Sequence, residues 1–283
     1  MITGKTKPIG ILGWPIEHSL SPHLHNTVFR ELNLNYIYIP LPVHPLQLKE
    51  AIQGLKSMGF VGANVTIPHK VAVMEYLDEI HETAKKIGAV NTIVIKNGKA
   101  IGYNTDGDGF IRALKKNHVV LPNVHTILLG AGGAARSVIC GLIYSGAKKI
   151  TVASRDKKKT QDFVQSFSNE IEISAYGWQE EEFLKTFSSC DLLINSTPIG
   201  MSGHSQELLP VRWEKLSTAA TVCDLIYNPP LTEFLAVARN RGHQIINGEG
   251  MLVEQAALAF EYWTGYTPDC QLFYNALQKV PKL

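Results

Sequence analysis

Six small residues, Gly130-Ala-Gly-Gly-Ala-Ala135, form the segment of this chain that is best suited to bind a phosphate group. They follow an apolar run that begins at Thr126, and they open a stretch, 134–146, that reads as a helix before a second strand-like run, 149–154. A strand, a glycine turn, a helix and a strand within about 30 residues form the context of a dinucleotide-binding fingerprint. Backbone N–H groups at such a helix start can approach a pyrophosphate closely. An ordinary glycine turn in a parallel sheet is the alternative interpretation.

The residues that end the second strand indicate which dinucleotide would bind. An NAD site usually has Asp or Glu there, about 20 residues past the glycines, to bind the ribose 2′-hydroxyl. This strand ends instead in Ser154 and Arg155, followed by Asp156 and the three lysines 157–159. A guanidinium can bind a 2′-phosphate through two hydrogen bonds, and a serine can add a donor. The pattern therefore predicts NADP, although the lysines could equally be a solvated helix start.

Two serines near the N-terminus, Ser19 and Ser21, straddle a predicted helix start. Their hydroxyl groups beside free helix N–H groups could bind a carboxylate or a phosphate. Alternatively, Ser21 only caps the helix, with Pro22 as its first residue. The three nearby histidines, at 18, 23 and 25, have no closely spaced Cys or carboxylate to complete a metal site, so we expect no metal.

A lysine and an aspartate occupy two further strand-to-helix turns. In Asn64-Val-Thr-Ile-Pro-His-Lys70, the polar residues Asn64 and Thr66 share one face of a predicted strand. Lys70 would follow in the first turn of a helix, where the helix dipole disfavours a cation, so it has a reason to meet an anion. It could also be a solvated lysine. Asp106 ends the second segment, 102–106, and could be a helix cap or a site residue.

The composition is that of a globular protein of the reducing cytoplasm. The chain has 283 residues, enough for two domains, with 45% hydrophobic and 18% charged residues. A net charge of +2 gives no general attraction to nucleic acid. The four cysteines lie far apart without a C-x-x-C pair, which fits reduced thiols better than disulfides. We find no apolar run of 18 residues and no secretory signal, so we expect no membrane partner.

Strand-like and helix-like runs alternate along the chain, which predicts an α/β architecture with largely parallel sheets. A predicted hairpin, 91–104, turns at Asn97-Gly98. The βα-like units before residue 106 form one candidate domain, and the glycine-turn region forms the other. The other predicted strands are 8–13, 36–40, 62–67, 191–196, 221–226 and 244–247, and the other predicted helices are 21–33, 45–58, 106–116, 231–240, 250–263 and 269–280.

Eight segments of this chain, taken in order, resemble the shikimate dehydrogenase family, and together they are far more specific than any one of them. They span nearly the whole chain. The segments are Gly13-Trp-Pro-Ile-Glu-His-Ser-Leu-Ser-Pro22, Asn64-Val-Thr-Ile-Pro-His-Lys70, Gly88-Ala-Val-Asn-Thr92, Gly102-Tyr-Asn-Thr-Asp106, Gly130-Ala-Gly-Gly-Ala-Ala-Arg136, Asn195-Ser-Thr-Pro-Ile-Gly-Met201, Asp224-Leu-Ile-Tyr-Asn228 and Gly250-Met-Leu-Val-Glu-Gln255.

The resemblance implies a substrate-binding α/β domain, 1–105, completed by the C-terminal helices 250–283, and a Rossmann-type NADP-binding domain, 106–249, with a cleft between them. It implies the reversible reduction of 3-dehydroshikimate to shikimate in aromatic amino-acid biosynthesis, with a small-molecule substrate and no nucleic-acid or membrane partner. The chain would be a monomer or a homodimer in the cytoplasm.

The resemblance also implies roles for individual residues. Lys70 and Asp106 would be the catalytic pair. The substrate carboxylate would bind to Ser19 and Ser21, near Tyr227, and the ring hydroxyls to Asn64, Thr66, Asn91, Asp106 and Gln255. NADP would bind to Gly130, Ala131, Gly132, Gly133, Ala134, Ser154, Arg155, Lys159, Thr197, Met201, Ile226 and Gly248.

Two rival functions and three departures from the family pattern stay open at this point. One rival is a quinate-preferring dehydrogenase of the same fold, and the other is a non-catalytic NADP-binding sensor, which would be expected to lack Lys70 or Asp106. Ser154 and Lys159 stand where the family usually has Asn and Arg, which concerns the strength of NADP selection. Glu249 stands where we expect an apolar residue or proline.

Overall fold

The computed structural model describes residues 2–167, 171–203 and 207–280, and the chain divides into two compact units. The first unit comprises Met1–Gly109 and Val253–Leu283, and the second comprises Phe110–Leu252. The chain passes from one unit to the other within helix α4 (Asp106–Lys116) and again within helix α9 (Glu249–Thr264). The boundaries predicted from the sequence, after residues 105 and 249, lie a few residues before these positions.

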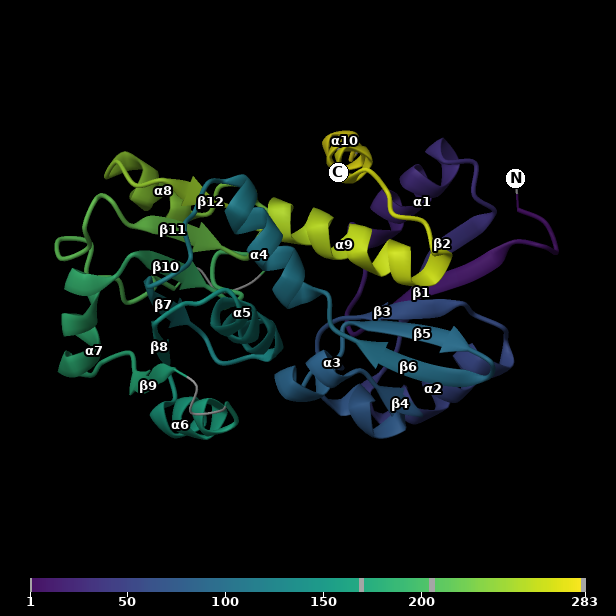
Figure 1. Ribbon diagram of the computed structural model, residues 1–283, viewed down its shortest axis with the longest axis horizontal. Helices are drawn as coiled ribbons and strands as arrows, with labels where there is room; N and C mark the ends of the chain where they lie inside the picture. The colour runs from purple at the N-terminus through teal and green to yellow at the C-terminus, as the bar shows by residue number, and fades with distance from the viewer. Residues whose placement is uncertain (1, 168–170, 204–206, 281–283) are drawn as a thin grey trace. The chain divides into compact units, whose positions relative to one another are not determined.

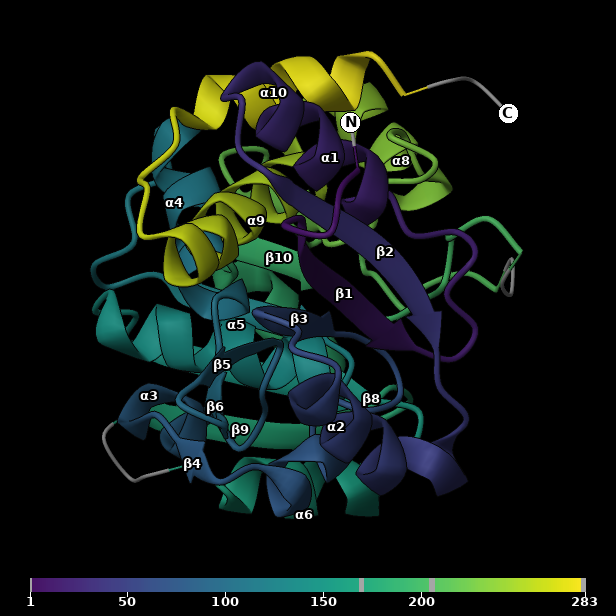
Figure 2. The same ribbon diagram turned by 90° about the vertical axis from the view of Figure 1, so that its right-hand side faces the viewer.

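The first unit contains a mixed six-stranded sheet with the order β2-β1-β3-β5-β6-β4 (Figures 1 and 2). Strands β2, β1 and β3 are parallel, whereas β5 pairs with both β3 and β6 in antiparallel fashion. Asn97 and Gly98 between β5 and β6 have φ angles of 52° and 74°, as a two-residue hairpin turn requires, which confirms the predicted hairpin. The strands are β1 (Lys7–Gly13), β2 (Tyr36–Pro42), β3 (Gly62–Val65), β4 (Glu79–Ile80), β5 (Thr92–Lys96) and β6 (Lys99–Tyr103).

Helices from both ends of the chain belong to this first unit. The N-terminal helix α1 (Ser21–Glu31) contacts the last helix, α10 (Cys270–Gln278), and the two lie side by side in Figure 2. The remaining helical segments are η1 (Pro45–Gln47), α2 (Leu48–Ser57), η2 (Ala72–Tyr76) and α3 (Glu82–Ile87).

A fully buried histidine, His25 of α1, lies at the centre of this packing. Its ring stacks on the ring of Tyr38, with 4.5 Å between the ring centroids. Within the described ranges, neither of its ring nitrogens has a hydrogen-bond partner. Burial without such a partner lowers the pKa of His25 to about 3, so this histidine is neutral in the folded protein. Further aromatic rings near it belong to Phe29, Phe260, Trp263 and Phe273.

The second unit contains a six-stranded sheet in which all paired strands are parallel, with the order β12-β11-β10-β7-β8-β9. Strand β7 is central: β8 and β9 follow on one side of it, and β10, β11 and β12 follow on the other side. This is the Rossmann order, and its switch point lies between β7 and β10. The strands are β7 (His125–Leu129), β8 (Lys149–Ser154), β9 (Glu172–Gly177), β10 (Leu192–Asn195), β11 (Thr221–Asp224) and β12 (Ile245–Ile246).

Strand β7 is buried at all five positions, as a central parallel strand covered on both faces must be. Leu128 packs with Val138 of helix α5 on one side of the sheet, while Leu129 packs with Phe183 and Leu235 on the other. The helical segments of this unit are α5 (Gly133–Tyr144), α6 (Lys157–Gln165), α7 (Glu181–Lys185), η3 (Thr186–Ser189) and α8 (Glu233–Asn240). The mixed α/β class and the two sheets agree with the prediction from the sequence.

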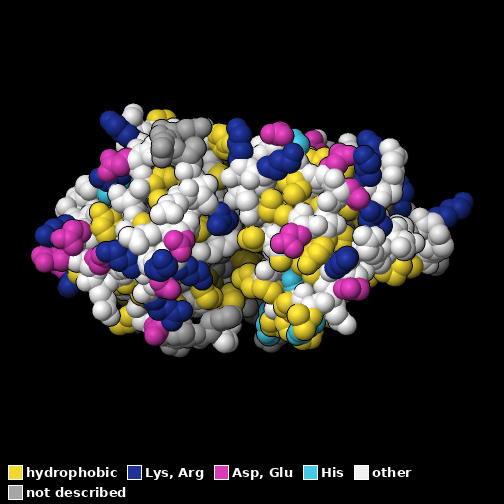
Figure 3. Space-filling model, turned by 90° about the horizontal axis from the view of Figure 1, so that it is seen from below, with side chains coloured by type: hydrophobic (Ala, Val, Ile, Leu, Met, Phe, Trp, Pro, Cys, Tyr) yellow, Lys and Arg dark blue, Asp and Glu magenta, His cyan; other side chains and the backbone are white. Residues whose placement is uncertain are grey.

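The surface carries charges of both signs. On the face shown in Figure 3, Lys and Arg side chains are interspersed with Asp and Glu side chains. Among the described residues, no helix is both long enough and apolar enough to cross a lipid bilayer.

Candidate active site

The two predicted catalytic residues form a close ion pair in the first unit. The Lys70 Nζ atom lies 2.6 Å from Asp106 Oδ2, and the side chains are only 17% and 7% exposed. The other oxygen, Asp106 Oδ1, accepts a hydrogen bond of 2.8 Å from the Asn91 amide. Both carboxylate oxygens are therefore engaged, and Asp106 has a fixed orientation toward the lysine.

The sequence prediction of a helix start at Lys70 is wrong. Lys70 lies in a turn after β3, and the short helix η2 begins only at Ala72. The charge that acts on Lys70 is therefore the Asp106 carboxylate at the start of α4, which the fold brings beside it, and not a helix dipole. The expected anion beside Lys70 is present.

Asn64 and Asn91 join this pair in one buried hydrogen-bond network. The Asn64 amide group donates to the Asn91 backbone oxygen and to Thr92 Oγ1, both at 3.1 Å. The Asn91 amide group donates to Asp106 and also to Thr105 Oγ1, at 2.9 Å. Three predicted site segments, around residues 64, 91 and 106, therefore meet in a single cluster.

Tyr38 also belongs to this network, although no sequence motif points to it. Its phenol donates a hydrogen bond of 2.6 Å to Asn64 Oδ1, and the Ser21 side chain lies beside it. Burial raises the pKa of this phenol well above its ordinary value. In the sequence, a tyrosine within an apolar strand is indistinguishable from an ordinary core residue. Thr92 and Thr105 were missed too, although both lie within segments that carry the family resemblance.

The structure corrects the predicted capping role of Ser21. Helix α1 begins at Ser21, its N-cap is Leu20, and among the described residues this N-cap position has no side-chain capping hydrogen bond. The backbone N–H of Ser21 is bonded instead to Ser19 Oγ, at 3.3 Å. The two serines are thus linked at a helix start without a side-chain cap, where an anion is favoured by the helix dipole.

The remaining predicted substrate residues differ in their placement. Thr66 follows β3, two positions beyond Asn64, and is half-buried. Gln255 lies on α9, whose backbone packs so closely on α4 that a Cβ atom at Gly109 would come within 2.7 Å of the Gln255 nitrogen. Tyr227, in contrast, belongs to the second unit, in the segment after β11, and burial raises its pKa.

Seven of the twelve predicted cofactor residues line a pocket at the switch point of the sheet in the second unit. This cavity has a volume of about 370 Å³. The N-cap residue of α5, Gly132, has no side chain to cap the helix, so its first N–H groups can face an anion. Gly130 has a φ of +110°, and a Cβ atom there would lie 2.6 Å from Ser196 Oγ. The lining residues are Gly130, Ala131, Gly132, Ser154, Arg155, Asp156, Lys159, Trp178, Ser196, Thr197, Pro198 and Ile199.

This lining fits a dinucleotide that carries a 2′-phosphate. Arg155 reaches the pocket with a largely exposed guanidinium, which forms a 3.3 Å ion pair with Glu207. An exposed pair of this kind contributes little and can be exchanged for a phosphate. The carboxylate of Asp156 accepts the backbone N–H of Lys159 at 3.0 Å and so caps α6. The acidic side chain at position 156 is therefore explained by helix capping, without an NAD ribose to bind.

Other predicted cofactor residues are held by a buried aspartate at the end of β11. Asp224 accepts hydrogen bonds from the Asn195 amide, the Ile226 N–H and the Thr232 hydroxyl. Burial raises its pKa to about 6. The N–H of Gly248 donates to Ile226 at 2.9 Å, and a Cβ atom at Gly248 would collide with Leu225. Thr197 follows Asn195 and donates its hydroxyl to Asn195 Oδ1 at 2.7 Å.

Four predicted cofactor residues, Ser154, Gly133, Ala134 and Met201, have the following positions. The Ser154 hydroxyl is buried and hydrogen-bonded to Thr160 at 2.7 Å. Gly133 and Ala134 begin α5. Met201 is half-buried and follows Gly200, which has a φ of +95°.

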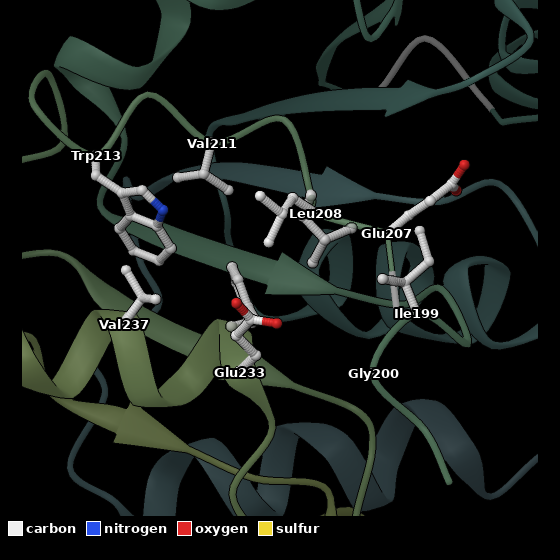
Figure 4. Close-up of a pocket in the computed structure, with 10 residues that line it drawn as sticks. Ile199, Gly200, Glu207, Leu208, Val211, Trp213, Glu233 and Val237 are labelled. Carbon is white, nitrogen blue, oxygen red and sulfur yellow. The ribbon is translucent and has the colours of Figure 1, made fainter. Parts of the chain in front are cut away.

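A second cavity of about 310 Å³ in this unit was not predicted from the sequence (Figure 4). Apolar side chains that include Leu208, Val211, Trp213 and Val237 line it. Figure 4 shows the Glu207 carboxylate directed away from Val211 and Trp213. The cavity thus adjoins the Arg155 partner but contributes no predicted site residue.

Comparisons with known proteins identify the family of this chain. Three family models match the chain: the shikimate dehydrogenase substrate binding domain at residues 11–93, shikimate / quinate 5-dehydrogenase at 113–202, and the shikimate 5′-dehydrogenase C-terminal domain at 248–278. A protein of Desulforamulus reducens named shikimate dehydrogenase (NADP(+)) is 43% identical over 98% of this chain and 97% of its own length.

Several solved structures share the whole fold. A shikimate dehydrogenase in complex with NADP+ is 42% identical, with a TM-score of 0.91 over 100% of this chain and 98% of its own. A shikimate 5-dehydrogenase from Listeria monocytogenes, in complex with shikimate and NAD, is 33% identical, with a TM-score of 0.90 over 98% of both chains. A 5-ketofructose reductase of a Gluconobacter strain is 34% identical, with a TM-score of 0.87 over 99% of this chain and 100% of its own. The chain belongs to the shikimate dehydrogenase family.

Proposed function

We propose that this chain catalyses the NADP-dependent, reversible reduction of 3-dehydroshikimate to shikimate in aromatic amino-acid biosynthesis. The observation that supports this most strongly is the partly buried Lys70–Asp106 pair, tied to Asn64 and Asn91 in a chain of this family. The first unit is the substrate-binding domain, and the second is the NADP-binding domain.

The proposed chemistry divides between the cofactor and the Lys70–Asp106 pair. NADP(H), when bound, supplies or accepts the hydride. Negative charge develops on the carbonyl oxygen of the substrate as it is reduced, and the Lys70 ammonium stabilises that charge and can donate the proton. Asp106 holds Lys70 in place through the 2.6 Å ion pair between the two side chains.

The proposed substrate contacts follow from the two ends of the network. Ser19 and Ser21 bind the substrate carboxylate at the start of α1. Asn64, Thr66, Asn91, Asp106 and Gln255 bind the ring hydroxyls. The proposed NADP contacts are Gly130 to Ala134 for the pyrophosphate, and Ser154, Arg155 and Lys159 for the 2′-phosphate. Thr197, Met201, Ile226 and Gly248 complete the site.

The direct test measures absorbance at the NADPH band with shikimate, quinate or 5-ketofructose as the second reactant. Each probe represents one proposed or rival function, since a related structure is a 5-ketofructose reductase. We expect kcat/KM to be highest for shikimate. A clear preference for quinate or 5-ketofructose would replace the proposed substrate. Binding of NADP without any turnover would instead support a sensor.

Ser19→Ala and Ser21→Ala are each expected to raise the KM for shikimate about tenfold to a hundredfold. A hydroxyl that donates to a carboxylate forms a charged hydrogen bond, and its loss costs about 1.5–3 kcal/mol. The KM for NADP should stay at the parental value. A change in the KM for NADP alone would contradict the assignment of the carboxylate site. Ser57→Ala, on helix α2, is the control.

Arg155→Ala is expected to lower the ratio of kcat/KM for NADP to that for NAD by about tenfold to a hundredfold. The 2′-phosphate would lose a charge-assisted bidentate partner, while NAD has no such group to lose. The measurement compares both cofactors in the parent and the variant. An unchanged ratio, or a parent that prefers NAD, would refute this interpretation of the strand end. Arg112→Ala, at an exposed position of α4, is the control.

We also propose that the protein acts in the cytoplasm as a monomer or a homodimer. Its four cysteines are free thiols, as expected in a reducing compartment. Light scattering at several protein concentrations would determine the oligomeric state.

A further inference from the structure

Tyr38 lies between two of the proposed substrate-binding regions. In the sheet of the first unit, Tyr38 on β2 is opposite Ile9 of β1, and Asn64 on β3 is opposite Ile11 of the same strand. Strand β1 therefore separates the two residues, and the tyrosine is long enough for its phenol to reach across to Asn64. This contact is 2.6 Å long and fully buried.

The hydrogen-bond directions around Asn64 are fixed by their partners. Its amide nitrogen must face the Asn91 backbone oxygen, because a carbonyl can only accept. Both amide hydrogens are thereby used, one by Asn91 and one by Thr92. The opposite atom, Oδ1, accepts the phenolic hydrogen of Tyr38. The raised pKa of the phenol keeps it protonated and hence a donor. One lone pair of Asn64 Oδ1 is left, and it can accept a hydrogen from a substrate hydroxyl.

The position of Tyr38 is itself determined by several contacts. The Asn26 side chain on α1 binds both backbone groups of Tyr38: it accepts the N–H at 2.9 Å and donates to the oxygen at 2.7 Å. The ring stacks on His25, and the Ser21 side chain lies beside the phenol. Tyr38 thus connects the proposed carboxylate site at Ser21 with the proposed hydroxyl site at Asn64.

We infer that Tyr38 is a positioning residue for substrate binding: its hydroxyl holds the Asn64 amide in the orientation that presents Oδ1 to a ring hydroxyl. The inference rests on the proposed function. Tyr38 acts through Asn64, so its removal should affect the binding of shikimate and leave the chemical step, which belongs to Lys70 and Asp106, nearly unchanged.

The test is Tyr38→Phe, which removes the hydroxyl and keeps the stacked ring. We expect the KM for shikimate to rise about fivefold to tenfold, the range for one lost neutral hydrogen bond, while kcat stays within about twofold. The Kd of shikimate, measured by calorimetry without turnover, should rise by the same factor. Tyr36→Phe, on the same strand with its ring stacked on Phe29, is the matched control and should leave the KM unchanged.

A double-mutant cycle with Asn64→Ala separates positioning from general stability. If Tyr38 acts through Asn64, Tyr38→Phe should add little to the KM effect of Asn64→Ala. A lowered Tm with a parental KM in Tyr38→Phe, or effects that multiply in the double variant, would overturn the inference. If Asn64→Ala itself leaves the KM unchanged, the proposed substrate site fails instead, so the two failures can be told apart.

Discussion

Lys70→Ala is expected to lower turnover by about 10²–10⁴-fold, the range for a lost general acid–base group. The carbonyl oxygen of the substrate needs both a positive charge and a proton during reduction, and Lys70 is the cation paired with Asp106 at 2.6 Å. The binding of shikimate should weaken less than turnover does, because Ser19, Ser21 and the asparagines remain. The measurement is kcat at saturating shikimate and NADP, together with the Kd of shikimate.

A control for this substitution is Lys85→Ala, since Lys85 is an exposed lysine of α3 in the same unit. It should keep parental turnover. Near-parental turnover in Lys70→Ala, with both reactants saturating, would exclude Lys70 from the chemistry. Asp106→Asn adds a second comparison, because it retains the shape of the side chain but removes the charge that holds the lysine.

The free energy of unfolding is expected to fall by about 3 kcal/mol between pH 7 and pH 4.5 because of His25 alone. Burial lowers the pKa of His25 to about 3, whereas an unfolded chain has a histidine pKa of about 6.5. Below pH 6.5 the unfolded state binds a proton that the folded state does not, so stability falls with pH until about pH 3. The lower measurement, at pH 4.5, lies two pH units below the histidine pKa of the unfolded chain, and two units correspond to roughly 3 kcal/mol.

The measurement is urea unfolding of the parent and of His25→Leu at both pH values. Other groups titrate in this range, so the relevant quantity is the difference in pH dependence between the two proteins. His25→Leu should lose roughly 3 kcal/mol less than the parent on acidification. His118→Asn, at an exposed position, should behave as the parent does. If the free energy of unfolding had the same pH dependence in His25→Leu and in the parent, His25 would be protonated at pH 4.5 in the folded state too, and the prediction would be wrong.

Much of the fold is encoded locally and was predictable. The β7-glycine-α5-β8 unit follows from a buried apolar run and a glycine turn, and the β5–β6 hairpin follows from Asn97-Gly98. These signals work because strand periodicity, helix starts and turn chemistry depend on neighbours within a few residues. Short strands such as β4 (Glu79–Ile80) were not predicted, because two residues carry no periodicity.

The residues of the candidate site were likewise selected mainly from sequence motifs and the family resemblance. These motifs place polar residues at strand ends and helix starts, and they include Lys70, Asp106, Ser21 and Arg155. The motifs do not predict which of these side chains contact one another. Two local predictions were wrong: Lys70 is not in a helix, and the alternative role of Ser21 as an N-cap is not the one that the structure shows.

Only the tertiary structure decided the partners. Lys70 and Asp106 are 36 positions apart, and they meet because the sheet brings the turn after β3 beside the start of α4. Tyr38 reaches Asn64 because β1 lies between β2 and β3, and β5 lies opposite β3 so that Asn64 faces Thr92. A hydrogen bond needs two groups within about 3 Å, and strand order sets that distance for residues far apart in sequence. The sequence by itself therefore determined the elements and the kinds of chemistry, whereas strand order and register determined which side chains carry it together.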